Sequence, residues 1–353
     1  MSALSPYEQK ALVNIEQEKQ RRLSTSPRRL MPPKVKAVAT GAGRRVKDLP
    51  GADRAADAAG RGYARAAEGV GKFLSRSSQF TLSSRRVVRA YHRRGFDVEG
   101  LEDIRALDLQ TIDGVARFKR LANLYAGAVA VEGAGAGLAI SGGALLAVGG
   151  SAGAGAAAAP GLAVVTGAVA GDAVAVLMAG SRVVAHTALY YGYDPEDPRE
   201  EVFAMSVINL GAATTQGAKM SAYGELSRLT QLLARSAPWE KLNQSMLTRV
   251  AQRFAAKFGQ DLTKKKLGQL VPVAGVVVGA GMNYALVDSI AEAAYWSYRE
   301  RFLRDKLGQA MSVPLQPDAP PDDVESDMQV DEAIDLLGLL EDEGFDTTDP
   351  DRP

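Results

Sequence analysis

The residues with the clearest chemical potential surround a serine in a glycine-rich stretch. Gly149-Gly150-Ser151-Ala152-Gly153 matches the G-x-S-x-G pattern of a hydrolase nucleophile elbow, and Asp172 and His186 follow in the order Ser, Asp, His. Such an elbow requires a strand before the serine and a helix after it. Here the flanking residues are almost all Gly and Ala, and the three residues lie within 36 positions, too few for the alternating sheet of such an enzyme. A hydrolase is therefore the third and least favoured interpretation.

Other kinds of catalytic or cofactor site have less support. The chain has no cysteine and only two histidines, His92 and His186, so we predict neither a thiolate zinc site nor a multi-histidine metal centre. Gly153-Ala154-Gly155 resembles a dinucleotide fingerprint, but no βαβ pattern surrounds it, and the phosphate-binding pattern G-x-x-x-x-G-K-S/T is absent. The sequence therefore predicts a non-enzymatic protein without catalytic, cofactor-binding or metal-binding residues.

Two long segments contain no charged residue. The first covers residues 133–171 and is dominated by Gly and Ala, and the second covers residues 267–287. Both reach the length that spans a bilayer, roughly 20 residues, but Gly, Pro and amide side chains make insertion of the second segment marginal. Small residues spaced four apart, such as Gly275 and Gly279, allow close helix packing in lipid and in a soluble bundle alike. Whether these segments insert in lipid or form a soluble core stays open.

Polar residues flank or interrupt the two charge-free segments. In a soluble bundle they would form a polar face or buried pairs, whereas in lipid they would be functional candidates. His186 lies on an apolar face with no second histidine nearby in the sequence, which favours a structural histidine over a metal ligand. The candidate polar core positions are Asp172, Arg182, His186, Asn283 and Asp288.

Net charge is distributed unevenly along the chain. The whole sequence has 42 Lys and Arg against 41 Asp and Glu, a formal charge of +1. Residues 1–120 carry 25 basic against 13 acidic side chains, a net of +12, whereas residues 307–353 carry 1 against 14, a net of −13. Such a basic head favours contact with a polyanion, a membrane surface or the chain's own acidic tail. No nucleic-acid-binding motif accompanies it, so nucleic acid ranks last among the candidate partners.

We predict an all-α protein, because helical periodicity recurs along the chain and no alternating strand pattern is present. The expected architecture is a multi-helix bundle with two Gly/Ala/Val-rich apolar helical hairpin segments and disordered termini. Composition indicates three regions: residues 1–50 as a basic helix and mobile linker, residues 51–308 as the helical domain, and residues 309–353 as an acidic, mostly disordered tail.

One segment of the acidic tail is expected to fold. Near residues 328–343, apolar side chains recur at helical spacing among acidic residues, as at Ile334, Leu337 and Leu340. We therefore expect a short docking helix there, and an intramolecular contact between the acidic tail and the basic head.

Several short motifs occur in an order that is typical of one protein family. They are Pro6-Tyr7-Glu8-Gln9-Lys10, Leu101-Glu102-Asp103-Ile104-Arg105, Glu132-Gly133-Ala134, Tyr191-Gly192-Tyr193-Asp194, Leu262-Thr263-Lys264-Lys265-Lys266-Leu267, Val271-Pro272-Val273-Ala274-Gly275 and Tyr298-Arg299-Glu300-Arg301-Phe302-Leu303. In this order the motifs resemble the EcsC protein family over nearly all of residues 5–308.

The resemblance implies a bacterial protein whose role is poorly defined. The family takes its name from a gene beside an ABC-type exporter linked to secretion, and its members look membrane-associated. It offers no established catalytic residues to carry over to this sequence. Two departures from the family pattern are an expanded Gly/Ala run at residues 142–160 and an acidic tail after residue 308.

Together these observations predict a non-enzymatic helical accessory protein at the cytoplasmic face of a bacterial membrane. It would be peripheral or shallowly inserted, and linked to transport or secretion through the family resemblance. Basic clusters would contact anionic headgroups or a membrane protein complex. The candidate contact residues are Arg28, Arg29, Arg44, Arg45, Lys264, Lys265 and Lys266. The alternative is a soluble helical module that binds a small apolar ligand or a protein partner.

Overall fold

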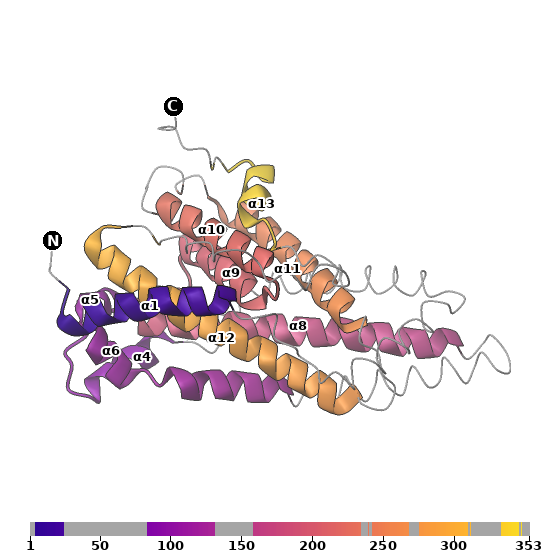
Figure 1. The fold of residues 1–353 in the computed structure, drawn as a ribbon, viewed down its shortest axis with the longest axis horizontal. Coiled ribbons are helices and arrows are strands. Elements are labelled where there is room, and N and C mark those ends of the chain that lie inside the picture. Colours follow the sequence, from indigo (N-terminus) through magenta and orange to yellow (C-terminus); the bar gives the residue numbers. More distant parts are fainter. Residues whose placement is uncertain are drawn as a thin grey trace.

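The computed structural model describes residues 4–24, 83–130, 158–233, 239, 242–267, 275–309, 311, 333–345 and 347. These residues form a bundle of α-helices with no strand among them, so the all-α prediction is confirmed (Figure 1). The expected linker before residue 50, most of the first charge-free segment and much of the acidic tail lie outside the described residues. The helices are α1 (Pro6–Ser24), α4 (Ser84–His92), α5 (Leu101–Ala106), α6 (Leu109–Val115), α8 (Ala158–Tyr190), α9 (Pro198–Ala212), α10 (Gln216–Leu233), α11 (Gln244–Leu267), α12 (Gly275–Leu307) and α13 (Leu336–Asp342), and a further helix covers residues 118–130.

Local sequence signals explain where two of these helices begin. Before α9, the Asp197 carboxylate accepts a hydrogen bond of 2.9 Å from the backbone N–H of Arg199, and Pro198 occupies the first helical position. Before α13, the Asp335 carboxylate accepts one of 2.9 Å from the backbone N–H of Gly338. Both carboxylates satisfy N–H groups that have no acceptor within the helix.

The two longest helices, α8 and α12, contain 33 residues each and run through the centre of the bundle (Figure 1). α12 packs against α8, α9 and α1, and α8 also packs against α11, α9 and α4. Residues 275–287 of the second charge-free segment continue into the charged half of α12 as one helix. Within those residues there is no turn of the kind that a hairpin requires.

The ends of four helices lie on the same side of the molecule (Figure 1). They are the end of the helix at residues 118–130, the start of α8, the end of α11 and the start of α12. Both charge-free segments adjoin these ends in the sequence. We call this side the apolar end of the bundle, and the opposite side, which holds α5, α6 and the end of α12, the polar end (Figure 1).

Two glycines allow α8 and α9 to approach α12 closely around one side chain. A Cβ atom on Gly211 of α9 would lie 2.5 Å from the Cα atom of Ile290 on α12, and one on Gly180 of α8 would lie 3.1 Å from the Ile290 Cδ1 atom. Ile290 is fully buried. At Gly211 the obstacle is backbone, which cannot rotate away, so this helix crossing requires glycine.

A short helix, α13, forms within the acidic tail. Prediction placed a docking helix near residues 328–343, and the structure has α13 at Leu336–Asp342, with residues 312–332 outside the described part of the chain. α13 packs on α11 and α10, which belong to the neutral middle of the sequence. Most of the basic head also lies outside the described residues, so its contact with the tail stays a prediction.

We predict that Gly211→Ala lowers the free energy of unfolding by about 2 kcal/mol, because the added methyl group forces α9 away from α12. Gly224→Ala on α10 is the matched control, since a Cβ atom there meets nothing within 4 Å. It should be neutral or stabilising by up to about 1 kcal/mol through helix propensity. Urea denaturation measures both effects, and equal stability of the two variants would contradict the close approach.

Candidate functional site

Charged and aromatic side chains near the end of α12 are buried in the bundle. The Arg301 guanidinium lies 2.8 Å from the Glu200 carboxylate, to which the Tyr298 hydroxyl also donates a hydrogen bond of 2.7 Å. Arg301 also lies over the rings of Tyr193 and Phe203, each with its centroid 4.3 Å away. Burial raises the pKa of Glu200, and the charge of Arg301 opposes that shift. Removing either member of this pair would leave a buried charge without its partner.

The same part of α12 binds α1 through two further ion pairs. The Lys19 ammonium lies 2.6 Å from the Glu300 carboxylate, and their side chains are only 4% and 1% exposed. The Lys306 ammonium lies 2.6 Å from the Glu8 carboxylate, which also accepts a hydrogen bond of 3.2 Å from the backbone N–H of Leu109. Glu8 therefore holds α1, α12 and the start of α6 together.

A third contact joins α12 to α6. Both carboxylate oxygens of Asp113 lie 2.7 Å from the Arg299 guanidinium, and the Tyr7 hydroxyl donates to the same carboxylate at 2.6 Å. Successive residues of α12 thus bind α9, α6, α1 and again α9. We call this group the charged cluster; it comprises Glu8, Lys19, Asp113, Glu200, Tyr298, Arg299, Glu300, Arg301 and Lys306.

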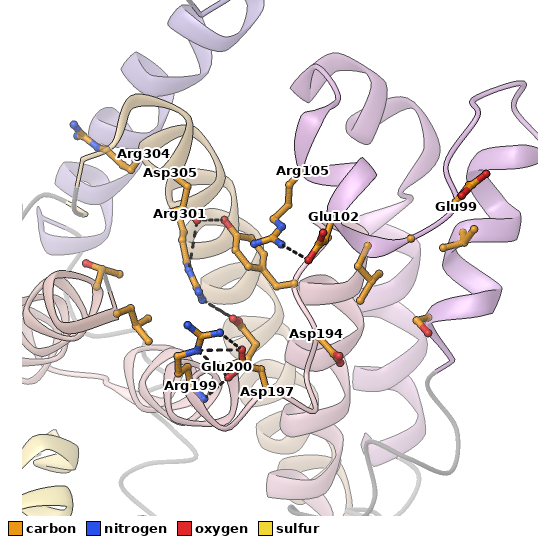
Figure 2. A pocket seen from close by; sticks show the side chains of 18 of the residues that line it. Glu99, Glu102, Arg105, Asp194, Asp197, Arg199, Glu200, Arg301, Arg304 and Asp305 are labelled. Carbon is orange, nitrogen blue, oxygen red and sulfur yellow. Dashed lines mark hydrogen bonds and ion pairs between the residues drawn. The ribbon is translucent and has the colours of Figure 1, made fainter. Parts of the chain in front are cut away.

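A cleft with a volume of about 1030 Å³ lies beside the charged cluster at the polar end (Figure 2). Several of its charged side chains are paired with one another: Arg105 with Glu102 at 3.8 Å, and Arg199 with Asp197 at 2.6 Å. Arg85 on α4 is exposed and forms no ion pair with another described residue. The charged lining residues are Arg85, Arg89, Glu99, Glu102, Arg105, Asp194, Asp197, Arg199, Glu200, Arg301, Arg304 and Asp305. Because both signs of charge line it, the cleft suits a polar ligand better than an apolar one.

The floor of the cleft depends on a tight turn after α8. Gly192 has a φ of +81°, and a Cβ atom there would lie 2.4 Å from the backbone oxygen of Leu101 and 2.8 Å from the Arg105 Cγ atom. The turn therefore sits directly on α5. It places the Tyr193 hydroxyl 2.6 Å from the Asp305 carboxylate, to which it donates a hydrogen bond.

The structure brings together two of the polar residues singled out from the sequence. Asp172 on α8 and Asn283 on α12 are buried, and the Asn283 amide donates a hydrogen bond to the Asp172 carboxylate. Arg182 and Asp288 are partly buried. The sequence singled out both residues, but it did not indicate that they meet between the two central helices.

His186 has an aromatic environment on α8. Its ring stacks on Tyr190 with centroids 5.4 Å apart, and its Nδ1 atom lies 3.5 Å from the hydroxyl oxygen of Tyr125. Burial, together with a smaller contribution from the positive charge of Arg86, lowers the pKa of His186 from 6.5 to about 4. The imidazole is therefore neutral at neutral pH.

The Ser-Asp-His arrangement considered for a hydrolase is not assembled. Asp172 and His186 lie 14 residues apart on one continuous helix, which separates them by roughly 21 Å along its axis. A catalytic triad requires hydrogen-bond contact between these two residue types. Ser151 lies outside the described residues. Among the residues that the structure describes, no group of three or more His, Asp and Glu side chains is placed to hold a metal ion.

The basic residues proposed for anion contact are described only in part. Lys264, Lys265 and Lys266 belong to the last turns of α11, at the apolar end, although their side chains are outside the described part of the structure. The four head residues lie wholly outside it; they are Arg28, Arg29, Arg44 and Arg45.

Sequence reasoning did not find the charged cluster. Its pairs join residues far apart in the chain, such as Glu8 and Lys306, and no local pattern shows that they meet. The sequence indicated these residues only indirectly, because most members of the charged cluster belong to the motifs on which the family resemblance rests. Those motifs, at residues 6–10, 101–105, 191–194 and 298–303, converge at the polar end.

Comparison with known proteins identifies a family for the second half of the bundle. Residues 151–303 match the model of the EcsC protein family. This region of the chain belongs to that family. The matched region includes α8, α9, α10, α11 and most of α12. From outside the match, α1 packs against α12 and α10, and Asp113 of α6 is bonded to Arg299 of α12.

Two relatives of the EcsC chain come from Bacillus subtilis (strain 168). The uncharacterized protein YdbA is 28% identical over 242 residues, which cover 67% of this chain and 76% of the relative. Protein EcsC is 28% identical over 119 residues, which cover 34% of this chain and 44% of that protein. No solved structure matches the chain significantly.

We predict that Glu200→Gln lowers the free energy of unfolding by about 3 kcal/mol, because it leaves the Arg301 guanidinium, whose side chain is only 12% exposed, without its nearest carboxylate. Glu196→Gln removes the same charge at an exposed position of the preceding turn and should change stability by less than about 0.5 kcal/mol. Thermal unfolding followed by circular dichroism compares the two. Similar melting temperatures would show that the pair does not stabilise the fold.

We predict a pH dependence that originates at His186. Between pH 6.5 and pH 4 the unfolded chain binds a proton at this residue and the folded chain does not, so acid favours unfolding. Lowering the pH from 7 to 4.5 should therefore reduce the free energy of unfolding of the wild type by about 2.5 kcal/mol more than that of His186→Phe. This variant keeps an aromatic ring against Tyr190. Urea titrations at both pH values measure the difference. Equal losses in the two proteins would contradict the prediction.

Proposed function

We propose that this EcsC family chain is a non-enzymatic helical accessory protein that binds the cytoplasmic face of a bacterial membrane through the apolar end of the bundle. One observation carries the proposal: the two charge-free segments, which 95 residues separate in the sequence, adjoin helix ends on the same side of the molecule (Figure 1). A protein that contacts lipid with one end requires such a concentration of uncharged residues.

Features near the apolar end support the proposal. Leu124 is 68% exposed and Tyr284 is 37% exposed, and the Tyr284 hydroxyl donates a hydrogen bond of 3.1 Å to the Asn123 side chain. Tyrosine with an exposed ring and a bonded hydroxyl suits the boundary between water and lipid. The lysines at 264–266 immediately precede the second charge-free segment, where anionic headgroups would meet them.

The polar end is less suited to lipid contact. Many of its charged side chains are paired with one another in the charged cluster and along the cleft, and burying that surface in lipid would require further loss of hydration.

Packing of α8 favours peripheral or shallow contact over a full span. Of the helices that the structure describes, α8 is the one with a stretch long and apolar enough to cross a membrane, Gly171–Tyr190. Neighbouring helices bury 61% of that stretch, as they would in the core of a soluble protein. A link to transport or secretion rests on family membership alone.

The test measures binding to vesicles of phosphatidylglycerol and phosphatidylethanolamine by flotation. We expect the wild type to float at low salt, and K264Q/K265Q/K266Q to bind on the order of 100-fold more weakly, since each lysine contributes about 1 kcal/mol. High salt should weaken wild-type binding through screening.

The matched control for this experiment is R117Q/K119Q/R120Q, which removes three exposed positive charges at the opposite end of the helix at residues 118–130. It should bind vesicles as the wild type does. If both triple variants lose affinity equally, the contact is not located at the apolar end. If the wild type stays in solution with vesicles at low salt, the second candidate function is favoured, a soluble helical module whose α8 is simply a core helix.

A further inference from the structure

The acidic tail helix α13 occupies a groove between α10 and α11. Asn209 at the end of α9 holds the approach to the helix through two hydrogen bonds with one residue: its amide donates to the Ile334 backbone oxygen at 2.7 Å, and its side-chain oxygen accepts from the Ile334 backbone N–H at 3.0 Å. A side-chain amide that satisfies both backbone groups of a docked residue recognises an extended peptide irrespective of its side chain.

A second contact holds the first turn of α13. The partly buried carboxylate of Glu225 on α10 accepts hydrogen bonds from the backbone N–H groups of Leu336 and Leu337, and also one of 3.1 Å from the Asn209 amide. These N–H groups have no acceptor within the helix, so Glu225 supplies one. Its hydrogen bond with Asn209 also links the two side chains that bind the backbone of the tail.

Apolar side chains of the tail fill the groove. Leu336 and Leu340 are fully buried, and Leu339 is 3% exposed. Beyond the helix, the ring of Phe345 packs on Trp239 with centroids 4.9 Å apart. The leucines therefore have the spacing of an amphipathic helix laid in a groove.

Arginines bind the far end of α13. The Glu343 carboxylate forms ion pairs with Arg249 and, at 2.9 Å, with Arg253, and Asp342 lies 3.4 Å from Arg253. Both arginines are about half exposed. They select acidic residues at this end of a docked segment, and partial exposure keeps the contribution of each pair modest.

α13 has only 7 residues, which is too short for a helix that is stable without tertiary contacts. Its folding is therefore coupled to docking. The segment is tethered by the chain itself, so it occupies the groove at a high effective concentration. A segment of another protein could displace α13 only if it formed the same backbone, apolar and charged contacts in the groove.

We propose that the groove between α10 and α11 is a docking site for an acidic, leucine-rich helical segment of a protein partner, and that α13 occupies this site until such a segment displaces it. The occupant seen in the structure defines the chemistry of the partner. A partner segment must present the N–H and C=O of one residue to Asn209 and two backbone N–H groups to Glu225. It must also carry leucines that fill the groove and a carboxylate that pairs with Arg249 and Arg253. This proposal is independent of membrane binding.

The test uses the full chain and a fluorescently labelled synthetic peptide of residues 331–347. In the wild type the tethered tail competes, so the peptide should bind weakly. Leu340→Asp in the chain's own tail weakens that docking and should raise peptide affinity at least tenfold. Glu343→Lys, which keeps the leucines and reverses the charge facing the two arginines, should act in the same direction. Fluorescence anisotropy measures binding, and circular dichroism establishes that each variant is folded.

The matched control adds Asn209→Ala to each tail variant, which should reduce peptide affinity at least tenfold, since both bonds to Ile334 are lost. Equal binding by the wild type and both folded tail variants, or no binding by any of them, would overturn the proposal. A concentration-dependent dimer of the wild type in light scattering would assign the groove to the tail of a second copy, and would overturn a separate partner.

Discussion

Placing charges inside the bundle constrains almost every other element of the structure. Tyr298, Arg299, Glu300 and Arg301 are consecutive on α12, and each is bonded to a side chain of another helix. A buried charge without a partner costs several kcal/mol, so the fold must supply all of the partners, which come from α1, α6 and α9. Such contacts are weak evidence for high stability, because desolvation offsets their attraction. Their effect is to define one arrangement of helices, since any shift of α1 or α9 along α12 would leave these charges unpaired.

Local features of the fold could be predicted from the sequence, whereas contacts between distant segments could not. The helical class follows from periodicity, and the family from short motifs in order. The close helix crossing shows the limit. The spacing of small residues predicted close packing at Gly275 and Gly279, whose surroundings lie outside the described part of the structure, but it did not single out Gly211, where the described crossing opposite Ile290 requires glycine. Which glycine faces a neighbouring backbone depends on how helices cross, and that is decided by the whole bundle. The cleft at the polar end was missed for the same reason, because its walls come from α4, α5, α9 and α12.

The bundle divides its chemistry between its two ends. Ion pairs, the charged cleft and the tight turn at Gly192 lie where α12 ends, whereas the described residues of the two charge-free segments form the starts of α8 and α12 at the other end. A long helix permits this division, because 33 residues extend roughly 50 Å and keep the two environments apart. The Asp172–Asn283 contact joins α8 to α12 between the two ends, and the neutral His186 lies one turn before the end of α8. Both use partners within the bundle.

Recognition of the tail through its backbone has an evolutionary consequence. Asn209 and Glu225 bind main-chain atoms of Ile334, Leu336 and Leu337, so most substitutions in the docked segment leave those bonds intact. Tails in related proteins are therefore free to diverge in identity while they retain a few apolar positions and one acidic residue. Ordinary alignment scores would rank such tails as unrelated, whereas the pair formed by an amide on α9 and a carboxylate on α10 would mark the chains that still possess the groove.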